Sequence, residues 1–247
     1  MANAVLLGSP EDFELLEIAR VLAGVLKVPL QDATTRAKRK WGILVENVDS
    51  SEAGRLAGQF QEAGLPVKVV PQDSLAILPE PQILSRTGGE TLEKIAGERI
   101  SLVAAAGFKR ISTTTTRVEE GPGAGVKALK LGILVTTGLP LPLGRKRVVE
   151  KTQEQSELVF YLDVFLNNPP GRWRVDAQSF DYSFLKERKL YQILGNFRLL
   201  VGDIAARTPN ALRNRGTRIL LENKPIREMG YESLRDLEQE SRWLLSL

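Results

Sequence analysis

Residues 156–204 read SELVFYLDVFLNNPPGRWRVDAQSFDYSFLKERKLYQILGNFRLLVGDI, and this stretch decides the fold. Apolar side chains recur at every second position from Leu158 to Leu166, which is the period of a β-strand. The run NNPPG at 167–171 cannot extend a central strand and predicts a turn. After the turn, Trp173, Val175 and Ala177 alternate with polar residues. The stretch therefore begins with a β-hairpin.

The spacing of the apolar residues changes after the hairpin. They now lie three or four positions apart, which predicts an amphipathic helix of about 20 residues. Thr208-Pro209 ends this helix, because proline has no N–H to donate and clashes with the preceding turn. We expect the apolar stripe to dock on the hairpin. The stripe consists of Leu190, Ile193, Leu194, Phe197, Leu200, Val201 and Ile204.

Two polar residues stand out within these apolar patterns. Asp163 has apolar strand neighbours, so its carboxylate needs a partner such as Arg174. Asn196 is a poor helix former that either faces solvent or hydrogen-bonds a loop. Asp163 with Asp176 and Asp181 offers oxygen ligands for a divalent cation, but their spacing follows no calcium-loop pattern. Isolated turn and edge charges are the favoured interpretation of these three residues.

The first 72 residues alternate between strand and helix patterns. Strands are predicted at Ala4–Leu7, Trp41–Val48 and Leu65–Val70. Ser9 followed by Pro10 favours a helix start, and Ser50 or Ser51 is expected to cap a later helix. A short helix is expected at 31–39, and Gly64 stops the last helix. The predicted order is strand, helix, short helix, strand, helix, strand, which forms a small α/β sandwich.

This part of the chain resembles the C-terminal domain of the bacterial ribosomal stalk protein. The resemblance covers roughly a quarter of the chain and implies a small protein-interaction fold. That family binds translation factors through its short helices, but Thr34 replaces its basic residue, so factor binding is not carried over. Convergence on a common α/β sandwich is the alternative. The residues that carry the likeness are Leu30-Gln31-Asp32-Ala33, Ser51-Glu52-Ala53, Glu62-Ala63-Gly64 and Val67-Lys68-Val69.

A Pro- and Gly-containing connector at 73–90 separates this module from the rest of the chain. The charge balance supports a boundary there. Residues 1–86 carry 9 basic and 11 acidic side chains, whereas the remainder carries 25 basic and 19 acidic. We therefore expect an α/β sandwich module at 1–72, a linker at 73–90 and a second module at 91–247.

The second module is expected to form an antiparallel sheet or partial barrel capped by the long amphipathic helix. Its outline looks like a pleckstrin-homology-type domain, although no motif accompanies the resemblance. A final helix begins at Ser233, with Asp236 completing the cap. The predicted class is α+β. Beyond the hairpin, the expected elements are a helical turn at 91–96 and strands at 100–106, 111–118, 129–136 and 148–152.

The amino-acid composition excludes several kinds of catalytic and metal-binding site. The chain of 247 residues contains no cysteine and no histidine, which excludes disulfides, thiolate chemistry, Ser-His-Asp triads and His-based zinc sites. The apolar run Leu131–Leu143 is too short and too broken to cross a bilayer, and no basic residue precedes Glu11. We therefore expect a cytoplasmic, non-transmembrane protein without a cofactor, and the case for an enzyme weakens.

Two sets of residues are candidate sites. Basic side chains between 109 and 151 form a face that suits nucleic-acid phosphates or anionic lipid, unless it is a solvated surface. Arg172, Trp173 and Arg174 suit an interface, although core packing of the tryptophan is the favoured alternative. Trp243 anchors the final helix and is a further interface candidate. The basic residues are Lys109, Arg110, Arg117, Lys127, Lys130, Arg145, Lys146, Arg147 and Lys151.

Three functions remain open from the sequence. The leading hypothesis is a non-enzymatic binding or scaffold protein with a protein partner. The second is a binder of nucleic acid or anionic lipid through the basic face. The third is an enzyme that uses Ser, Lys or carboxylate chemistry, for which no nucleophile is identified. The apolar final helix also permits pairing of two copies of the chain.

Overall fold

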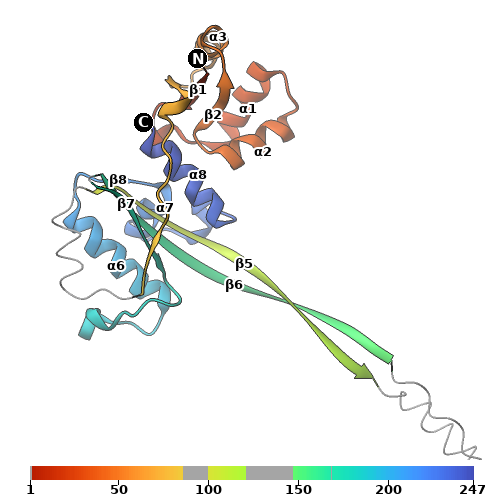
Figure 1. The fold of residues 1–247 in the computed structure, drawn as a ribbon, viewed down its shortest axis with the longest axis vertical. Coiled ribbons are helices and arrows are strands. Elements are labelled where there is room, and N and C mark those ends of the chain that lie inside the picture. Colours follow the sequence, from red (N-terminus) through yellow and green to blue (C-terminus); the bar gives the residue numbers. More distant parts are fainter. Residues whose placement is uncertain (1, 86–99, 121–146, 168) are drawn as a thin grey trace, which may run out of the picture. The chain divides into compact units, whose positions relative to one another are not determined.

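The computed structural model describes residues 2–85, 100–120, 147–167 and 169–247 (Figure 1). Contacts divide the chain into two compact units. Unit 1 comprises Met1–Lys109 and Leu158–Leu247, and unit 2 comprises Arg110–Glu157. The predicted α+β class is confirmed, because helices accompany one antiparallel and one mixed sheet. The expected boundaries at 72 and 90 stay predictions, since this division runs elsewhere along the chain.

The N-terminal part of unit 1 has the predicted order of elements. Strand β1 lies in the middle of a three-stranded sheet and pairs antiparallel with both β2 and β3. Ser9 accepts a hydrogen bond from Glu11 N, but it caps the 3-10 turn Pro10–Asp12, and the long helix begins only at Leu15. Gly64 has a positive φ of 87°. The elements are β1 (Asn3–Leu7), α1 (Leu15–Leu26), α2 (Leu30–Lys40), β2 (Ile43–Val48), α3 (Ser50–Glu62) and β3 (Val67–Pro71).

One predicted cap in this region is wrong. Helix α3 begins one residue earlier than expected, and Asp49 rather than a serine accepts the hydrogen bond from Glu52 N at 2.9 Å. A carboxylate also complements the positive end of the helix dipole better than a hydroxyl does. Both serines therefore lie inside the first turn of the helix.

The second sheet is built around the predicted hairpin. Strands β6 and β7 pair antiparallel, from Tyr161 opposite Asp176 to Asn167 opposite Pro170. The sheet is open, with β4 and β8 at its two edges. It is mixed, because these two short outer strands run parallel to their neighbours. Its order is β4 (Gln82–Leu84), β7 (Pro170–Asp176), β6 (Arg147–Asn167), β5 (Ile100–Glu120) and β8 (Leu212–Arg213).

The segments flanking the hairpin differ in detail from the sequence prediction. The expected linker contributes β4, which pairs with Trp173–Val175. The two strands expected at 100–106 and 111–118 form one continuous strand, β5. Gly107 between them does not turn the chain, and a Cβ there would lie 2.7 Å from the Phe160 ring. The strand expected at 148–152 lies within β6. The helical turn at 91–96 and the strand at 129–136 lie outside the described residues.

Three further helices follow the hairpin among the described residues of unit 1. The predicted amphipathic helix is α6 (Ile193–Arg207), which ends at Thr208 before Pro209. Its docking on the hairpin is confirmed, because the rings of Phe160 and Phe197 lie 5.7 Å apart. Helices α7 (Arg215–Leu221) and α8 (Leu234–Leu245) come next, and the Ser233–Asp236 capping box is present as expected. Short 3-10 turns occur at Pro10–Asp12 (η1), Gln72–Ser74 (η2), Ser183–Arg188 (η3) and Ile226–Met229 (η4).

Helix α8 packs against the N-terminal sheet. The Trp243 indole N–H donates to Leu7 O at 2.9 Å, and its ring covers Gly42 so closely that a Cβ there would lie 1.9 Å from it. Phe13 and Trp41 stack at 5.0 Å, and Trp41 lies 4.9 Å from Tyr231. The N-terminal module and the C-terminal helices therefore share one apolar core within unit 1.

The described part of unit 2 is a two-stranded ribbon formed by residues 110–120 of β5 and 147–157 of β6. An ion pair joins Arg110 to Glu157, and Ser112 Oγ donates to Gln155 O at 3.4 Å. Residue numbers rise on one strand as they fall on the other, so the ribbon is antiparallel.

Candidate functional site

The basic face expected between 109 and 151 is described only in small part. Lys109 and Arg110 are exposed, and Arg110 is paired with Glu157. The backbones of Arg117 and Arg147 lie in β5 and β6, whereas their side chains are outside the described set, as is that of Lys151. Lys127, Lys130, Arg145 and Lys146 also lie outside it. Binding of nucleic acid or anionic lipid by this face stays a prediction.

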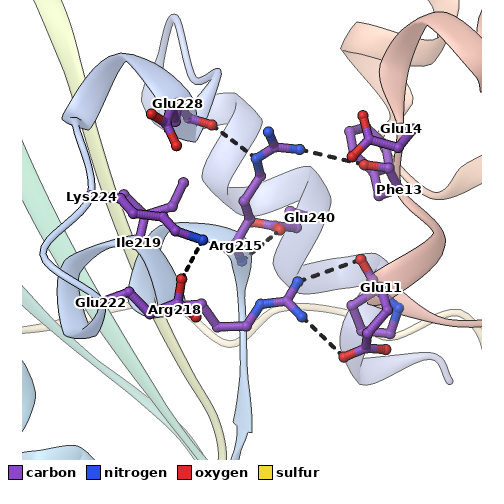
Figure 2. A pocket seen from close by; sticks show the side chains of 11 residues that line it. Glu11, Phe13, Glu14, Arg215, Arg218, Ile219, Glu222, Lys224, Glu228 and Glu240 are labelled. Atoms are coloured by element: carbon purple, nitrogen blue, oxygen red, sulfur yellow. Dashed lines mark hydrogen bonds and ion pairs between the residues drawn. The ribbon is translucent and has the colours of Figure 1, made fainter.

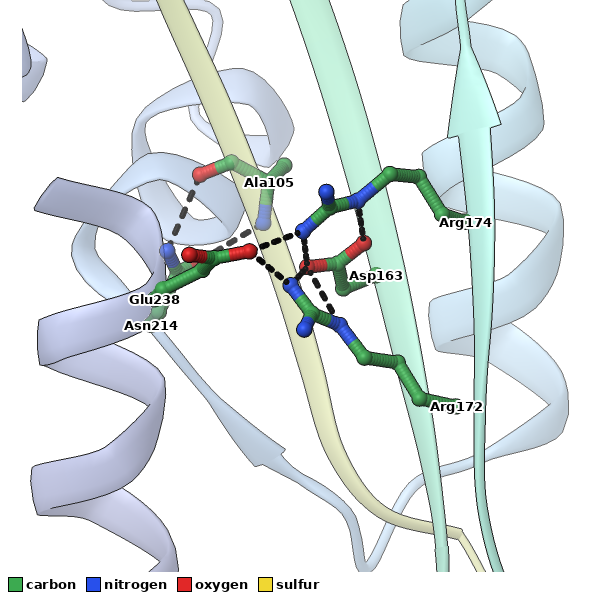
Figure 3. Close-up of polar contacts among 6 residues, drawn as sticks. All are labelled: Ala105, Asp163, Arg172, Arg174, Asn214 and Glu238. Carbon is green, nitrogen blue, oxygen red and sulfur yellow. Dashed lines mark hydrogen bonds and ion pairs between the residues drawn. The ribbon is translucent and has the colours of Figure 1, made fainter. Parts of the chain in front are cut away.

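The interface candidates of the hairpin form a buried ion network instead (Figure 3). Arg172 and Arg174 both donate to the fully buried Asp163 carboxylate, at 2.6 and 2.7 Å for their shortest contacts. Each also donates to Glu238 Oε1 of α8 at 3.0 Å. The predicted Asp163–Arg174 pair is confirmed, and Arg172 and Glu238 are additional members. Trp173, which stands between the two arginines in the sequence, is also buried.

Burial dominates the electrostatics of this network. It raises the pKa of the Asp163 carboxyl from 3.8 to about 7, although Arg174 opposes the rise by attraction and by its hydrogen bond. The nearby Glu238 charge raises this pKa further. The four groups therefore tie the hairpin to α8. In this conformation Arg172, Trp173 and Arg174 present no free surface to a partner.

Trp243 is also buried, with 1% of its side chain exposed. Its indole lies between α8 and the N-terminal sheet, where it contacts Leu7 and Gly42. Trp243 anchors the final helix as expected, but it does so inside the chain rather than at an exposed interface.

The largest exposed aromatic side chain among the described residues lies elsewhere, on residues 186–193, which we call the docking loop. Most of its residues are exposed, and Tyr191 is fully exposed. Leu190 and Ile193 beside it are 52% and 44% exposed. Sequence reasoning missed this site, because Leu190 and Ile193 were assigned to the buried stripe of the helix.

Buried Asn196 holds the docking loop in place. Its amide oxygen accepts from Leu190 N at 2.6 Å, and its amide nitrogen donates to Leu190 O at 2.9 Å. The Leu190 side chain lies over Gly195, where a Cβ would come within 2.7 Å of it. Of the two alternatives for Asn196, bonding to a loop is therefore correct. Leu190, which this amide bonds, lies before α6, which begins at Ile193.

The docking loop carries positive charge and a strained residue. Lys186, Arg188 and Lys189 outnumber Glu187, which leaves a net charge of +2 on this segment. Arg188 is paired with Asp203 of α6 at 2.6 Å, whereas Lys186 and Lys189 are exposed. Lys186 has a φ of 49° with ψ of −120°, a conformation that non-glycine residues rarely adopt and that recurs at functional sites.

A cavity of about 320 Å³ lies between η1 and α7 (Figure 2). Four of its charged lining residues form two ion pairs: Arg218 contacts Glu11 at 3.0 Å, and Lys224 contacts Glu222 at 2.5 Å. Arg215 donates to the Glu228 backbone oxygen at 2.9 Å. Among the described lining residues, these contacts leave no obvious activated nucleophile.

A buried polar network supports the floor of this cavity. Asn214 is fully buried, accepts from Ala105 N and Thr217 N, and donates to Glu240 at 2.9 Å. The Tyr231 hydroxyl also donates to Glu240. Burial raises the pKa of Glu240, while the Tyr231 hydrogen bond opposes the rise. Sequence reasoning missed this network, for which the only signal was an asparagine at a helix start.

The acidic side chains of the described ranges do not gather into a metal site. Within these ranges, no three of them lie close enough to hold a metal ion. Asp176 and Asp181 accept from the backbone N–H groups of Gln178 and Ser183, as turn carboxylates do. No helix in the described part of the chain is both long and apolar enough to span a bilayer.

Comparisons with known protein families, with curated proteins and with solved structures gave no match to this chain. The resemblances to the stalk-protein domain and to the pleckstrin-homology-type outline therefore stay predictions. The function of the chain has to be inferred from the geometry of its described residues.

Proposed function

We propose that this chain is a non-enzymatic binding protein whose docking loop contacts another protein. The observation that carries this proposal is the fully exposed Tyr191 on a loop that buried Asn196 clamps. Tyrosine is among the residues that contribute most to protein interfaces. A preorganised loop loses little conformational entropy on binding, so more of its contact energy appears as affinity.

The chemistry of the docking loop indicates the kind of partner. Tyr191, Leu190 and Ile193 suit an apolar patch, and the exposed Lys186 and Lys189 suit carboxylates around it. A bilayer also accepts aromatic and basic side chains, but a fluid surface does not require its anchor to be held in one conformation. The clamp therefore favours a protein surface that combines apolar and acidic side chains.

Capture from cell extract, compared between variants, tests this function. We expect the immobilised chain to retain a protein that Tyr191→Ser no longer retains, while Ile77→Ser retains it fully. Ile77 is a matched control because it is 92% exposed and lies outside the docking loop. The captured protein, once purified, should bind wild type about tenfold more tightly than Tyr191→Ser.

The other outcomes of the same experiment oppose the proposal. If Tyr191→Ser and Ile77→Ser retain the captured protein equally, the docking loop is not part of the interface. Release of nucleic acid or phospholipid as salt rises would favour the basic face instead. Capture of a second copy of this chain through Tyr191 would identify the loop as a self-association site rather than a partner site.

A further inference from the structure

Strand β3 forms an open edge of the N-terminal sheet in unit 1. Among the described strands its only neighbour is β1, and none of its five residues is buried. Lys68, Val69 and Pro71 are exposed, and the exposed fraction of Val69 is 43%. A sheet edge with unpaired N–H and C=O groups offers a template on which another strand can pair.

Hydrogen bonds at the two ends of the β1–β3 pair show which residues of β3 face their neighbour. Gly8 N donates to Pro66 O at 2.8 Å, and Gln72 N donates to Ala2 O at 2.9 Å. Both bonds continue the register of the pair. Hydrogen-bonded and non-hydrogen-bonded positions alternate along an antiparallel pair, so the even-numbered residues of β3 bond to β1. The odd-numbered residues direct their N–H and C=O groups away from β1.

The outward-facing backbone groups of β3 are available to a further strand. They are the N–H and C=O groups of Val67 and Val69 and the carbonyl of Pro71, which has no N–H. No hydrogen bond from the Val67 or Val69 groups to a residue outside the β1–β3 pair is found in the described part of the chain. Pro71 O accepts from Ser74 Oγ at 2.7 Å and keeps a second lone pair. The open edge is therefore short, and its N–H donors belong to two valines.

Two copies of β3 match each other as antiparallel partners. When Val69 lies opposite Val69 of a second copy, each of the two residues donates to the other and accepts from it. Val67 N–H of each copy then lies opposite Pro71 O of the other copy, because both residues are two positions from Val69. This pairing gives every outward-facing N–H of both strands an acceptor.

The charge of Lys68 selects this register over its neighbour. Lys68 is the only charged residue of β3. A register centred on Lys68 would also bring outward-facing groups together, but it would place two like charges directly opposite each other, which is destabilising. In the register centred on Val69, each Lys68 lies opposite the uncharged Val70 of the other copy.

We propose that β3 is a self-association surface, and that its occupant is β3 of a second copy of the chain in the register centred on Val69. A two-fold axis at Val69 makes the contact closed and symmetric, and it joins two three-stranded sheets into one continuous sheet. The exposed Val69 side chains then cover each other across the axis. The proposal is independent of the docking loop, to which no residue of β3 belongs.

Disulfide trapping in the full chain tests the register. The chain has no cysteine, so each single-cysteine variant carries one thiol. Opposite residues of a hydrogen-bonded pair have Cα atoms about 5.5 Å apart, which a disulfide spans, whereas diagonal neighbours such as the two copies of Lys68 are about 7–8 Å apart. Under mild oxidation we expect Val69→Cys to form a covalent dimer about tenfold faster than Lys68→Cys or Ile77→Cys, which is a highly exposed control.

Analytical ultracentrifugation then measures the affinity without a crosslink. Val69→Lys places two like charges opposite each other and should raise the dissociation constant of the dimer about tenfold. Val69→Thr keeps a β-branched side chain and should change it less than about threefold. Tyr191→Ser should dimerise as wild type does, because the docking loop takes no part in this contact.

Three results would overturn the proposal. The first is a wild-type chain that sediments as a monomer even near millimolar concentration. The second is trapping of Lys68→Cys or Ile77→Cys at least as fast as that of Val69→Cys, which would mean a different register or random collision. The third is a dimer that Tyr191→Ser dissociates and Val69→Lys does not, which would place self-association on the docking loop.

Discussion

At the scale of single residues, the chain uses polar side chains to hold backbone segments in place. Asp163 holds two arginines in the hairpin, Asn214 joins β5 to two helices, and Asn196 holds the docking loop. Each is buried, and each makes several hydrogen bonds, which buried polar groups need in order not to destabilise the fold. Changes at these positions therefore affect more than one element.

Loss of Arg174 should destabilise the chain in a pH-dependent way. Because burial raises the pKa of Asp163 to about 7 from its ordinary value of 3.8, wild-type stability falls as the pH rises through the interval between these values and levels off above about 7. Arg174→Gln raises this pKa further, so we expect an extra loss of about 3 kcal/mol near pH 9 that shrinks toward pH 6. Denaturant unfolding across this range measures it.

The matched control is Arg188→Gln, which removes an exposed pair with Asp203. Its cost should stay below about 1 kcal/mol at every pH, because solvent screens that pair. A pH-independent loss in Arg174→Gln would contradict the assigned role of Asp163.

Removal of the Asn196 amide should weaken partner binding without removing any contact surface. Asn196→Ala leaves Tyr191 exposed but frees Leu190 N and O, so we expect a roughly fivefold lower affinity from the added entropy cost. Titration calorimetry against the captured partner measures it. Gln178→Ala is the control, because Gln178 likewise bonds two backbone groups, Leu158 O and Phe160 N, away from the loop. Equal losses in both variants would refute preorganisation.

At the scale of elements, sequence periodicity predicted the long elements and missed the short ones. The hairpin from Leu158 to Ala177 and helix α6 carry enough apolar residues to establish a period. Strands β4 and β8 have three and two residues, which are too few for any period, and they form because tertiary neighbours offer a free sheet edge.

The candidate sites were predictable only where a local rule applied. The apolar strand neighbours of Asp163 predicted a basic side chain as its partner, and Arg174 is that partner. Tyr191 was missed because the helical periodicity was extended back to Leu190, whereas α6 begins at Ile193 and the Asn196 side chain bonds Leu190 outside the helix. The role of Asn214 depends on its hydrogen bond with Ala105, which lies more than a hundred residues away in the sequence. A local sequence pattern cannot predict such a contact.

The packing of α8 against the residue before β2 should tolerate no side chain at position 42. A Cβ on Gly42 would lie 1.9 Å from the Trp243 ring, so Gly42→Ala must displace the indole and break its bond to Leu7. We expect a loss of about 3 kcal/mol in unfolding free energy, measured by thermal and denaturant unfolding. Gly24→Ala inside α1 meets nothing within 4 Å and should instead stabilise by about 0.5 kcal/mol. Equal effects of both changes would contradict this packing.

At the scale of the whole molecule, residues far apart in sequence share one core in unit 1. The Trp41 ring packs against that of Tyr231, and the Trp243 indole N–H donates to Leu7 O, so the first 72 residues are packed against the last helices. The docking loop that presents Tyr191 belongs to the same unit as this core. The proposed function therefore depends on one residue held by the fold rather than on a catalytic group.

A photo-crosslinking amino acid placed at position 191 of the full chain tests the proposed function most directly. The same group at position 77, which is also highly exposed, is the control. We predict that position 191 forms a covalent adduct with one protein whose crosslinked surface holds apolar and acidic side chains, and that position 77 does not. Adducts of equal yield at both positions, or adducts with lipid or nucleic acid alone at position 191, would contradict a protein-binding docking loop.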